Sequence, residues 1–199
     1  MPLPRRILPA TLASAFWASG CAATTPAVSS TSSLREPTTA PSSIAVTIEG
    51  LDANGAIATE STFAGFGCQG KNRSLALRWS SVSGAKSYAL VMHDLDAPTG
   101  VGFFHWVAFD IPPGTTSLPA GASKSSMPGG SVEAHTDFGS AGYGGPCPPP
   151  GTPHRYEVTV YAVDAPMLGL EASATGALAR VMLGQQTIAL GRASATYAR

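Results

Sequence analysis

Short runs in which apolar and polar residues alternate recur along the chain from residue 43 to the C-terminus. Alternation with a period of two is typical of a β-strand that buries one face. We expect strands of this kind at 43–50, 74–82, 154–164 and 187–199. Within 154–164, the residues that share the apolar face are Tyr156, Val158, Val160 and Ala162.

Two further runs are almost continuously apolar. Residues 86–94 read KSYALVMHD, which predicts a central strand buried on both faces. Residues 103–112 form an aromatic and β-branched run that ends at two prolines. Only 170–183 has a helical period. The apolar stripe expected there is Leu170, Ala174, Ala177, Leu178, Val181 and Met182, with Gly184 ending the helix. The pattern predicts a mainly β fold with a helix near the C-terminus.

Composition agrees with this fold class and limits the possible partners. The chain has 22 Gly and 17 Pro, which favours many short strands joined by turns. Lys and Arg together number 12, as do Asp and Glu, so the formal net charge is zero. A protein that binds nucleic acid usually has a basic excess. We therefore expect no nucleic-acid partner.

The N-terminus has the pattern of a bacterial secretion signal. Arg5 and Arg6 precede an apolar run at 7–17, and small residues follow it. These small residues and the cysteine after them read ASGC, which is similar to a lipobox, with Cys21 as the residue that would be lipidated. Ala18 occupies the position where a lipobox usually has Leu, and ordinary secretion with cleavage nearby is the alternative.

Three segments follow from this pattern. We expect a lipoprotein signal peptide at 1–20, a disordered tether at 21–43 and one folded domain at 44–199. The tether is rich in Ser, Thr and Pro and has too little apolar surface to form a core. The protein is then exported and attached through its lipid to a membrane, and we expect the outer membrane, facing the periplasm.

Two cysteines, Cys68 and Cys147, remain in the predicted domain. A pair of cysteines in an exported protein favours a disulfide, because the compartment is oxidising. Two reduced, buried thiols are the alternative.

Several sequence motifs of enzymes are absent or incomplete. GFGCQGKN at 65–72 has glycines spaced as in a dinucleotide or phosphate loop. Such loops precede a helix, whereas the residues after Asn72 are strand-like. The chain also has no G-x-S-x-G, H-E-x-x-H or C-x-x-C motif. We expect no catalytic activity of these kinds and no cofactor.

Polar side chains gather at the ends of three predicted strands. Asp94 and Asp96 follow the buried run, and Pro98 stiffens the exit from it. His105 opens the next strand, and His154 opens another directly after the stiff loop GYGGPCPPPGTP. A carboxylate and two imidazoles beside Gly/Pro loops predict one shared pocket. For His105 alone, the alternative is a structural role, hydrogen-bonded at a packed edge.

The segments HDLDAP, HWVAFDIP and YGGPCPPPGTPHRY resemble signature blocks of the phosphatidylethanolamine-binding protein (PEBP) family. They are most similar to its bacterial Raf-kinase-inhibitor-like (YbhB/YbcL) branch, as are GCQGKNRSLALRW and the C-terminal ATYAR. The resemblance covers 44–199. It implies a large antiparallel sheet packed on a smaller sheet, with short peripheral helices. It also implies non-catalytic binding of a small anion or phospholipid headgroup.

By motif match, the resemblance implies a ligand pocket formed by Asp94, Asp96, Pro98, His105, Tyr143, Gly145, Pro146, His154 and Tyr156. We expect His105 and His154 to donate hydrogen bonds to the anion. Asp94 would orient a histidine or accept from an ammonium group. Tyr143 or Tyr156 would add a hydroxyl donor, and the Gly/Pro loop would form a rigid wall with amides close to the anion.

The sequence departs from the family pattern at two positions. Leu75 and Leu95 occupy positions where the family usually has Pro, and we expect this to loosen the pocket rim.

One alternative function is a metal-dependent hydrolase that uses Asp94, His105 and His154 as ligands. The other is an inhibitor that docks a partner protein at the pocket, although the sequence identifies no protein partner.

The lipobox gives the first testable prediction. If Cys21 becomes the acylated first residue of the mature protein, Cys21→Ala releases the protein from the membrane into the soluble fraction, which fractionation of cells would detect. Continued membrane association of Cys21→Ala, with its signal sequence intact, would contradict the assignment.

Overall fold

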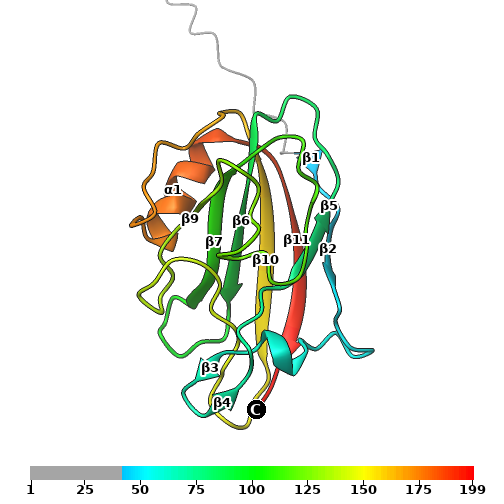
Figure 1. Ribbon diagram of the computed structural model, residues 1–199, viewed down its shortest axis with the longest axis vertical. Helices are drawn as coiled ribbons and strands as arrows, with labels where there is room; N and C mark the ends of the chain where they lie inside the picture. The colour runs from blue at the N-terminus through cyan, green and yellow to red at the C-terminus, as the bar shows by residue number, and fades with distance from the viewer. Residues whose placement is uncertain (1–41) are drawn as a thin grey trace, which may run out of the picture. The chain divides into compact units, whose positions relative to one another are not determined.

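Strands dominate the part of the chain that the computed structural model describes, residues 42–199 (Figure 1). The expected signal peptide, Cys21 and the tether up to residue 41 lie outside the described residues. The strands are β1 (Ser42–Ser43), β2 (Val46–Glu49), β3 (Ala64–Gly65), β4 (Cys68–Gln69), β5 (Ala76–Trp79), β6 (Ser87–Asp94), β7 (Phe103–Ile111), β8 (Ser117–Leu118), β9 (Val132–Glu133), β10 (His154–Val163) and β11 (Thr187–Tyr197). A short 3-10 helix, Thr59–Ser61, and the α-helix α1, Gly176–Gln186, complete the secondary structure.

The strands form a large sheet, a small sheet and a hairpin. The large sheet has the order β1-β11-β10-β6-β7-β9, and the three-stranded sheet has the order β2-β5-β8. Strands β3 and β4 pair as a separate hairpin. All pairs are antiparallel except β1 with β11. Ser42 and Ser43, which the sequence analysis assigned to the tether, therefore belong to the large sheet.

The central strands of the large sheet are buried on both faces. One face of β6 packs with the small sheet in a core that includes Leu90, Met92 and Trp106. The other face packs under α1 in a second core that includes Val91 and Leu183. All eight residues of β6 are buried, as its continuous apolar run predicted. The alternation in β10 also holds, because the four residues of its predicted apolar face all lie in the first core.

The helix exists, but the predicted apolar stripe was wrong. Thr175 caps the helix by accepting from the Leu178 amide, so α1 begins six residues after Leu170. Its buried residues are Gly176, Ala179 and Leu183, whereas Leu178 and Val181 are exposed. The helix continues through Gly184 and ends at Gln186, where β11 follows directly. No helix within residues 42–199 is long and apolar enough to span a membrane.

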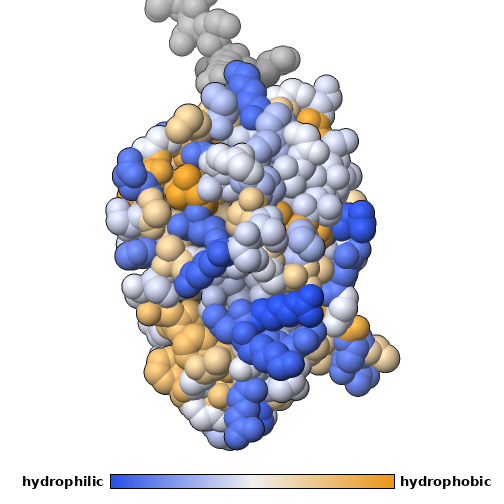
Figure 2. All heavy atoms as spheres, viewed as in Figure 1, coloured by the Kyte–Doolittle hydropathy of each residue, from blue (hydrophilic) through white to orange (hydrophobic). Residues whose placement is uncertain are grey.

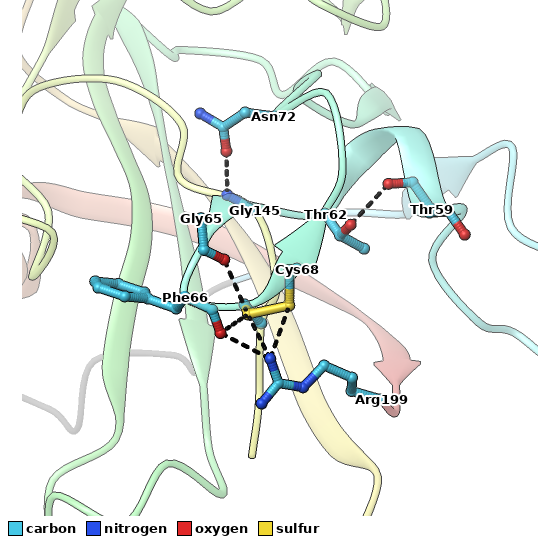
Figure 3. Close-up of a disulfide and its surroundings, with 9 residues drawn as sticks. Thr59, Thr62, Gly65, Phe66, Cys68, Asn72, Gly145 and Arg199 are labelled. Atoms are coloured by element: carbon cyan, nitrogen blue, oxygen red, sulfur yellow. Dashed lines mark hydrogen bonds between the residues drawn. A yellow bond between two sulfur atoms is a disulfide. The ribbon is translucent and has the colours of Figure 1, made fainter. Parts of the chain in front are cut away.

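A disulfide ties the β3–β4 hairpin to the Gly/Pro loop (Figure 3). Cys68 and Cys147 are bonded with Cα atoms 6.0 Å apart and 79 positions apart in sequence, which confirms the predicted pair. A bridge that closes a loop of this length stabilises a fold by about 4 kcal/mol in the chain-entropy model. The glycine-rich segment is therefore a hairpin beside a disulfide and not a phosphate loop.

Asn72 fastens the same loop through its side chain. Its Oδ1 accepts from the Gly145 amide at 2.7 Å, and its Nδ2 donates to the Tyr143 carbonyl at 3.0 Å (Figure 3 shows the first bond). The φ of Asn72 is 52°, in the left-handed region that Asn tolerates better than most residues. Gly145 cannot be replaced by a larger residue, because a Cβ there would collide with the Ser61 carbonyl. The loop therefore has one position relative to the hairpin.

These contacts predict that Asn72→Gly is strongly destabilising. Gly keeps the left-handed backbone but removes both hydrogen bonds, which leaves the buried Gly145 amide without its acceptor. The free energy of unfolding, measured by urea denaturation, should fall by about 2–4 kcal/mol. Asn54→Gly, at an exposed turn position, is the matched control and should change it by less than about 1 kcal/mol. Equal stability of the two variants would show that the Asn72 side chain does not hold the loop.

Candidate functional site

A cavity of about 250 Å³ lies at one end of the central strands of the large sheet. The C-terminal end of β6 lies there beside the first residues of β7 and β10, because both neighbours run antiparallel to it. Asp94 is paired with Phe103 on one side and with Tyr156 on the other. The cavity is lined by Phe66, Asp94, Ala97, Pro98, Thr99, Phe103, His105, Phe138, Cys147, Pro148, Pro149 and His154. Asp94, Pro98, His105 and His154 from the predicted set thus come together.

Asp94 and His154 form a buried pair. The Nδ1 atom of His154 lies 2.7 Å from Oδ2 of Asp94, and both side chains are largely shielded from solvent. Since a carboxylate oxygen accepts, Nδ1 carries the proton. The other oxygen of Asp94 accepts from the Asp96 amide at 2.9 Å. Asp94 therefore orients a histidine, as the sequence analysis expected.

A β-bulge turns His105 toward the same pair. Between β6 and β7, Met92 lies opposite Trp106 and His93 lies opposite Phe104, so His105 is an extra residue in β7. A bulge of this kind redirects a side chain that regular alternation would place on the other face. The His105 ring accordingly packs edge-on against Tyr156, with 5.2 Å between the ring centroids.

His105 is neutral and its one ring proton is engaged. Its Nδ1 lies 2.7 Å from the Gly144 carbonyl, which can only accept, so Nδ1 is the donor. Burial lowers the pKa of His105 to about 4. The family resemblance implies that this imidazole donates a hydrogen bond to an anion. The structure instead directs its N–H to the protein backbone.

Tyr156 lies beneath the cavity. Its hydroxyl is buried beside the Asp94 carboxylate. Burial, together with the negative charge of Asp94, raises the pKa of Tyr156. The hydroxyl is therefore protonated, and it lies behind the residues that line the cavity.

The remaining four predicted residues lie outside the cavity lining. Asp96 is held by two hydrogen bonds from the Arg155 guanidinium, at 2.9 and 2.7 Å, and these contacts lower its pKa to about 2. The buried Tyr143 hydroxyl donates to the Ser61 carbonyl. The Gly145 amide donates to Asn72, and the Pro146 carbonyl accepts from the Phe63 amide. Gly145 and Tyr143 thus support the wall of the cavity and do not offer it a donor.

Aromatic residues that the sequence analysis did not single out form much of the wall. Phe138 packs against Phe63 at 4.4 Å and against Phe103 at 4.9 Å between ring centroids. Phe66, at the tip of the β3–β4 hairpin, is 76% exposed and has a φ of 53°. Figure 2 shows an apolar area beside this hairpin, near the ends of β6 and β7. Phe138 follows no strand pattern, so no signal in the sequence marked it.

The two departures from the family prolines have structural consequences. The Leu95 amide donates to the Arg155 carbonyl at 2.9 Å, a bond that Pro cannot make. This substitution ties the rim to β10, contrary to the expected loosening. Leu75 is buried in the core between the two sheets.

No three His, Cys, Asp or Glu side chains in the described part of the chain gather in a way that could hold a metal ion. Asp94, His105 and His154 therefore do not form the ligand set that a metal-dependent hydrolase would need.

Known proteins with similar sequences identify the family. The profile of the phosphatidylethanolamine-binding protein family matches residues 22–198. The UPF0098 protein YbcL of Escherichia coli strain K12 is 40% identical over 146 residues, which cover 71% of this chain and 80% of YbcL. The protein named "Putative lipoprotein LppC" in Mycobacterium tuberculosis strain H37Rv is 37% identical over 133 residues, covering 66% of this chain and 63% of LppC.

The fold is shared as well. The crystal structure of E. coli YbcL, described as a new member of the mammalian PEBP family, matches with a TM-score of 0.76 at 37% identity. The match covers 79% of this chain and 99% of the YbcL chain. The predicted large antiparallel sheet packed on a smaller sheet, and the resemblance to the YbhB/YbcL branch, are thereby confirmed. The chain belongs to the phosphatidylethanolamine-binding protein family.

Proposed function

We propose that this protein binds a small phosphorylated headgroup or similar oxyanion in the cavity, without chemical turnover, as a lipid-anchored protein of the cell envelope. The observation that carries the proposal is the buried Asp94–His154 pair, with His105 beside it, in a cavity walled by aromatic rings. Convergent polar groups in an otherwise apolar pocket are typical of a ligand site.

The absence of a free nucleophile favours binding over catalysis. A histidine oriented by a carboxylate is also the base of a catalytic triad, which needs a hydroxyl or thiol within reach. Among the residues that line the cavity, Cys147 is in a disulfide, and the Thr99 hydroxyl donates to the Gly102 carbonyl at 2.6 Å. Neither group is available to attack a ligand.

The cavity suits a small ligand with a charged and an organic part. At about 250 Å³, it is smaller than the pockets that hold drug-sized molecules, which begin at about 300 Å³. Phe66, Phe103 and Phe138 line the cavity, and an aromatic ring attracts an ammonium group that lies over its face. Phosphoethanolamine combines these features, and the family name refers to a lipid that carries this headgroup.

The cellular location follows from the N-terminal sequence and from one relative. Cys21 lies in a lipobox-like segment after a secretion signal. LppC, which is named a lipoprotein, shares 37% identity with this chain. An anchor at Cys21 would hold the binding domain near a membrane, and we expect the outer membrane, facing the periplasm. The lipid attached to Cys21 would then join the protein to the membrane. We expect no nucleic-acid partner.

Calorimetric titration with O-phosphoethanolamine tests the proposal. Wild-type protein should bind weakly, and His154→Ala should weaken binding at least about tenfold, because it removes a polar contact and leaves Asp94 unpaired. His135→Ala is the matched control, since His135 is exposed and does not line the cavity. Thermal unfolding confirms that each variant is folded, and ³¹P NMR should show no release of inorganic phosphate.

Two outcomes would contradict the proposal. Equal affinity of the wild type and folded His154→Ala would place the binding site elsewhere. Release of phosphate that depends on His154 would show that the cavity is catalytic.

A further inference from the structure

The hydrogen bonds around His105 leave the cavity with an acceptor where an anion would ordinarily meet a donor. His105 and Gly144 are joined twice: His105 Nδ1 donates to the Gly144 carbonyl at 2.7 Å, and the Gly144 amide donates to the His105 carbonyl at 2.8 Å. This pair of hydrogen bonds fixes the orientation of the His105 ring as well as its tautomer. In a neutral ring with the proton on Nδ1, Nε2 has a lone pair and accepts.

His105 Nε2 is free to meet a ligand. The ring lines the cavity, and the hydrogen bond of good geometry that it makes within residues 42–199 is the one from Nδ1 to the Gly144 carbonyl. It is also not among the polar atoms that are completely buried without a partner. The charged and titratable groups that face the ring are Asp94 from β6, His154 and Tyr156 from β10, and Asp137 from the loop before the Gly/Pro segment.

The ring stays neutral over most of the pH range. Burial is the largest influence on its pKa and outweighs the opposing effects of the backbone contacts with Gly144 and Gly145 and of the carboxylates of Asp94 and Asp137. The folded protein therefore keeps Nε2 unprotonated at pH values above about 4, whereas an unfolded chain would protonate this histidine below about 6.5.

Two backbone amides of the adjacent Gly/Pro loop are already engaged within the protein. The Gly144 amide is bonded to His105 and the Gly145 amide to Asn72. Asp94 adds a carboxylate, which also accepts. An oxyanion without a proton would therefore place a lone pair against the lone pair of His105, which is unfavourable.

We propose that the cavity selects phosphate monoesters in their singly protonated form, with the P–OH donating to Nε2 of His105. The inference rests on the proposed function and narrows its ligand class. A phosphate diester, as in an intact phospholipid, has no P–OH, and neither has a sulfate ester. The second ionisation of a phosphate monoester has a pKa of about 6, so the protonated form is abundant in mildly acidic solution.

Three ligands of equal charge test the proposal in the unmodified protein. At about pH 5, methyl phosphate, dimethyl phosphate and methyl sulfate are all monoanions, but only methyl phosphate has a hydroxyl proton. Calorimetric titration should give an affinity for methyl phosphate at least about tenfold higher than for the other two. At about pH 8, methyl phosphate loses its proton, and its affinity relative to methyl sulfate should fall despite its greater charge.

A variant links this preference to the ring nitrogen. His105→Phe keeps an aromatic ring and removes the acceptor, so the preference for methyl phosphate over methyl sulfate should disappear. His135→Ala should keep it.

Each outcome decides between the proposals. Equal affinity for the three ligands at about pH 5 would overturn the inference and leave the proposed anion site intact. If none of the three binds, both the proposed function and the inference are overturned. The ligand comparison needs no variant, so it remains decisive even if His105→Phe does not fold.

Discussion

His105 and Gly144 exchange two hydrogen bonds, and the cavity depends on this exchange. It joins the start of β7 to the Gly/Pro loop, two segments that come from different parts of the chain. Gly144 must be glycine there, because a Cβ would collide with the Phe138 ring. The same contact gives His105 its tautomer. One local constraint therefore determines both the position of a wall and the chemistry that the wall presents.

Other ties restrain the same loop from different directions. Asn72 holds Gly145 and Tyr143, and the disulfide holds Cys147 to the β3–β4 hairpin. A neutral hydrogen bond contributes about 1 kcal/mol net, and a disulfide closing a loop of this length contributes about 4 kcal/mol. Together these restraints explain why the loop is rich in Gly and Pro. Gly permits the close approaches, and Pro reduces the freedom that the loop loses on folding.

The sequence predicted the features that depend on regular periodicity. The apolar run in β6 and the alternation in β10 identified buried faces. Antiparallel pairing of the two strands then brought Asp94 and His154 to the same end of the sheet. The orientation of His105 depends on a bulge, which no alternation rule predicts. Tyr143 and Gly145 were recognised by motif, but their polar groups bond within the protein. The helix stripe failed because its spacing was counted from a residue that precedes the helix.

The property that distinguishes this cavity is that His105 presents a lone pair to it, and not an N–H. The ¹⁵N chemical shifts of the His105 ring, measured by NMR on the folded protein at about pH 5, test it most directly. We expect a protonated Nδ1 and an unprotonated Nε2. A ring with both nitrogens protonated, or with the proton on Nε2, would contradict it.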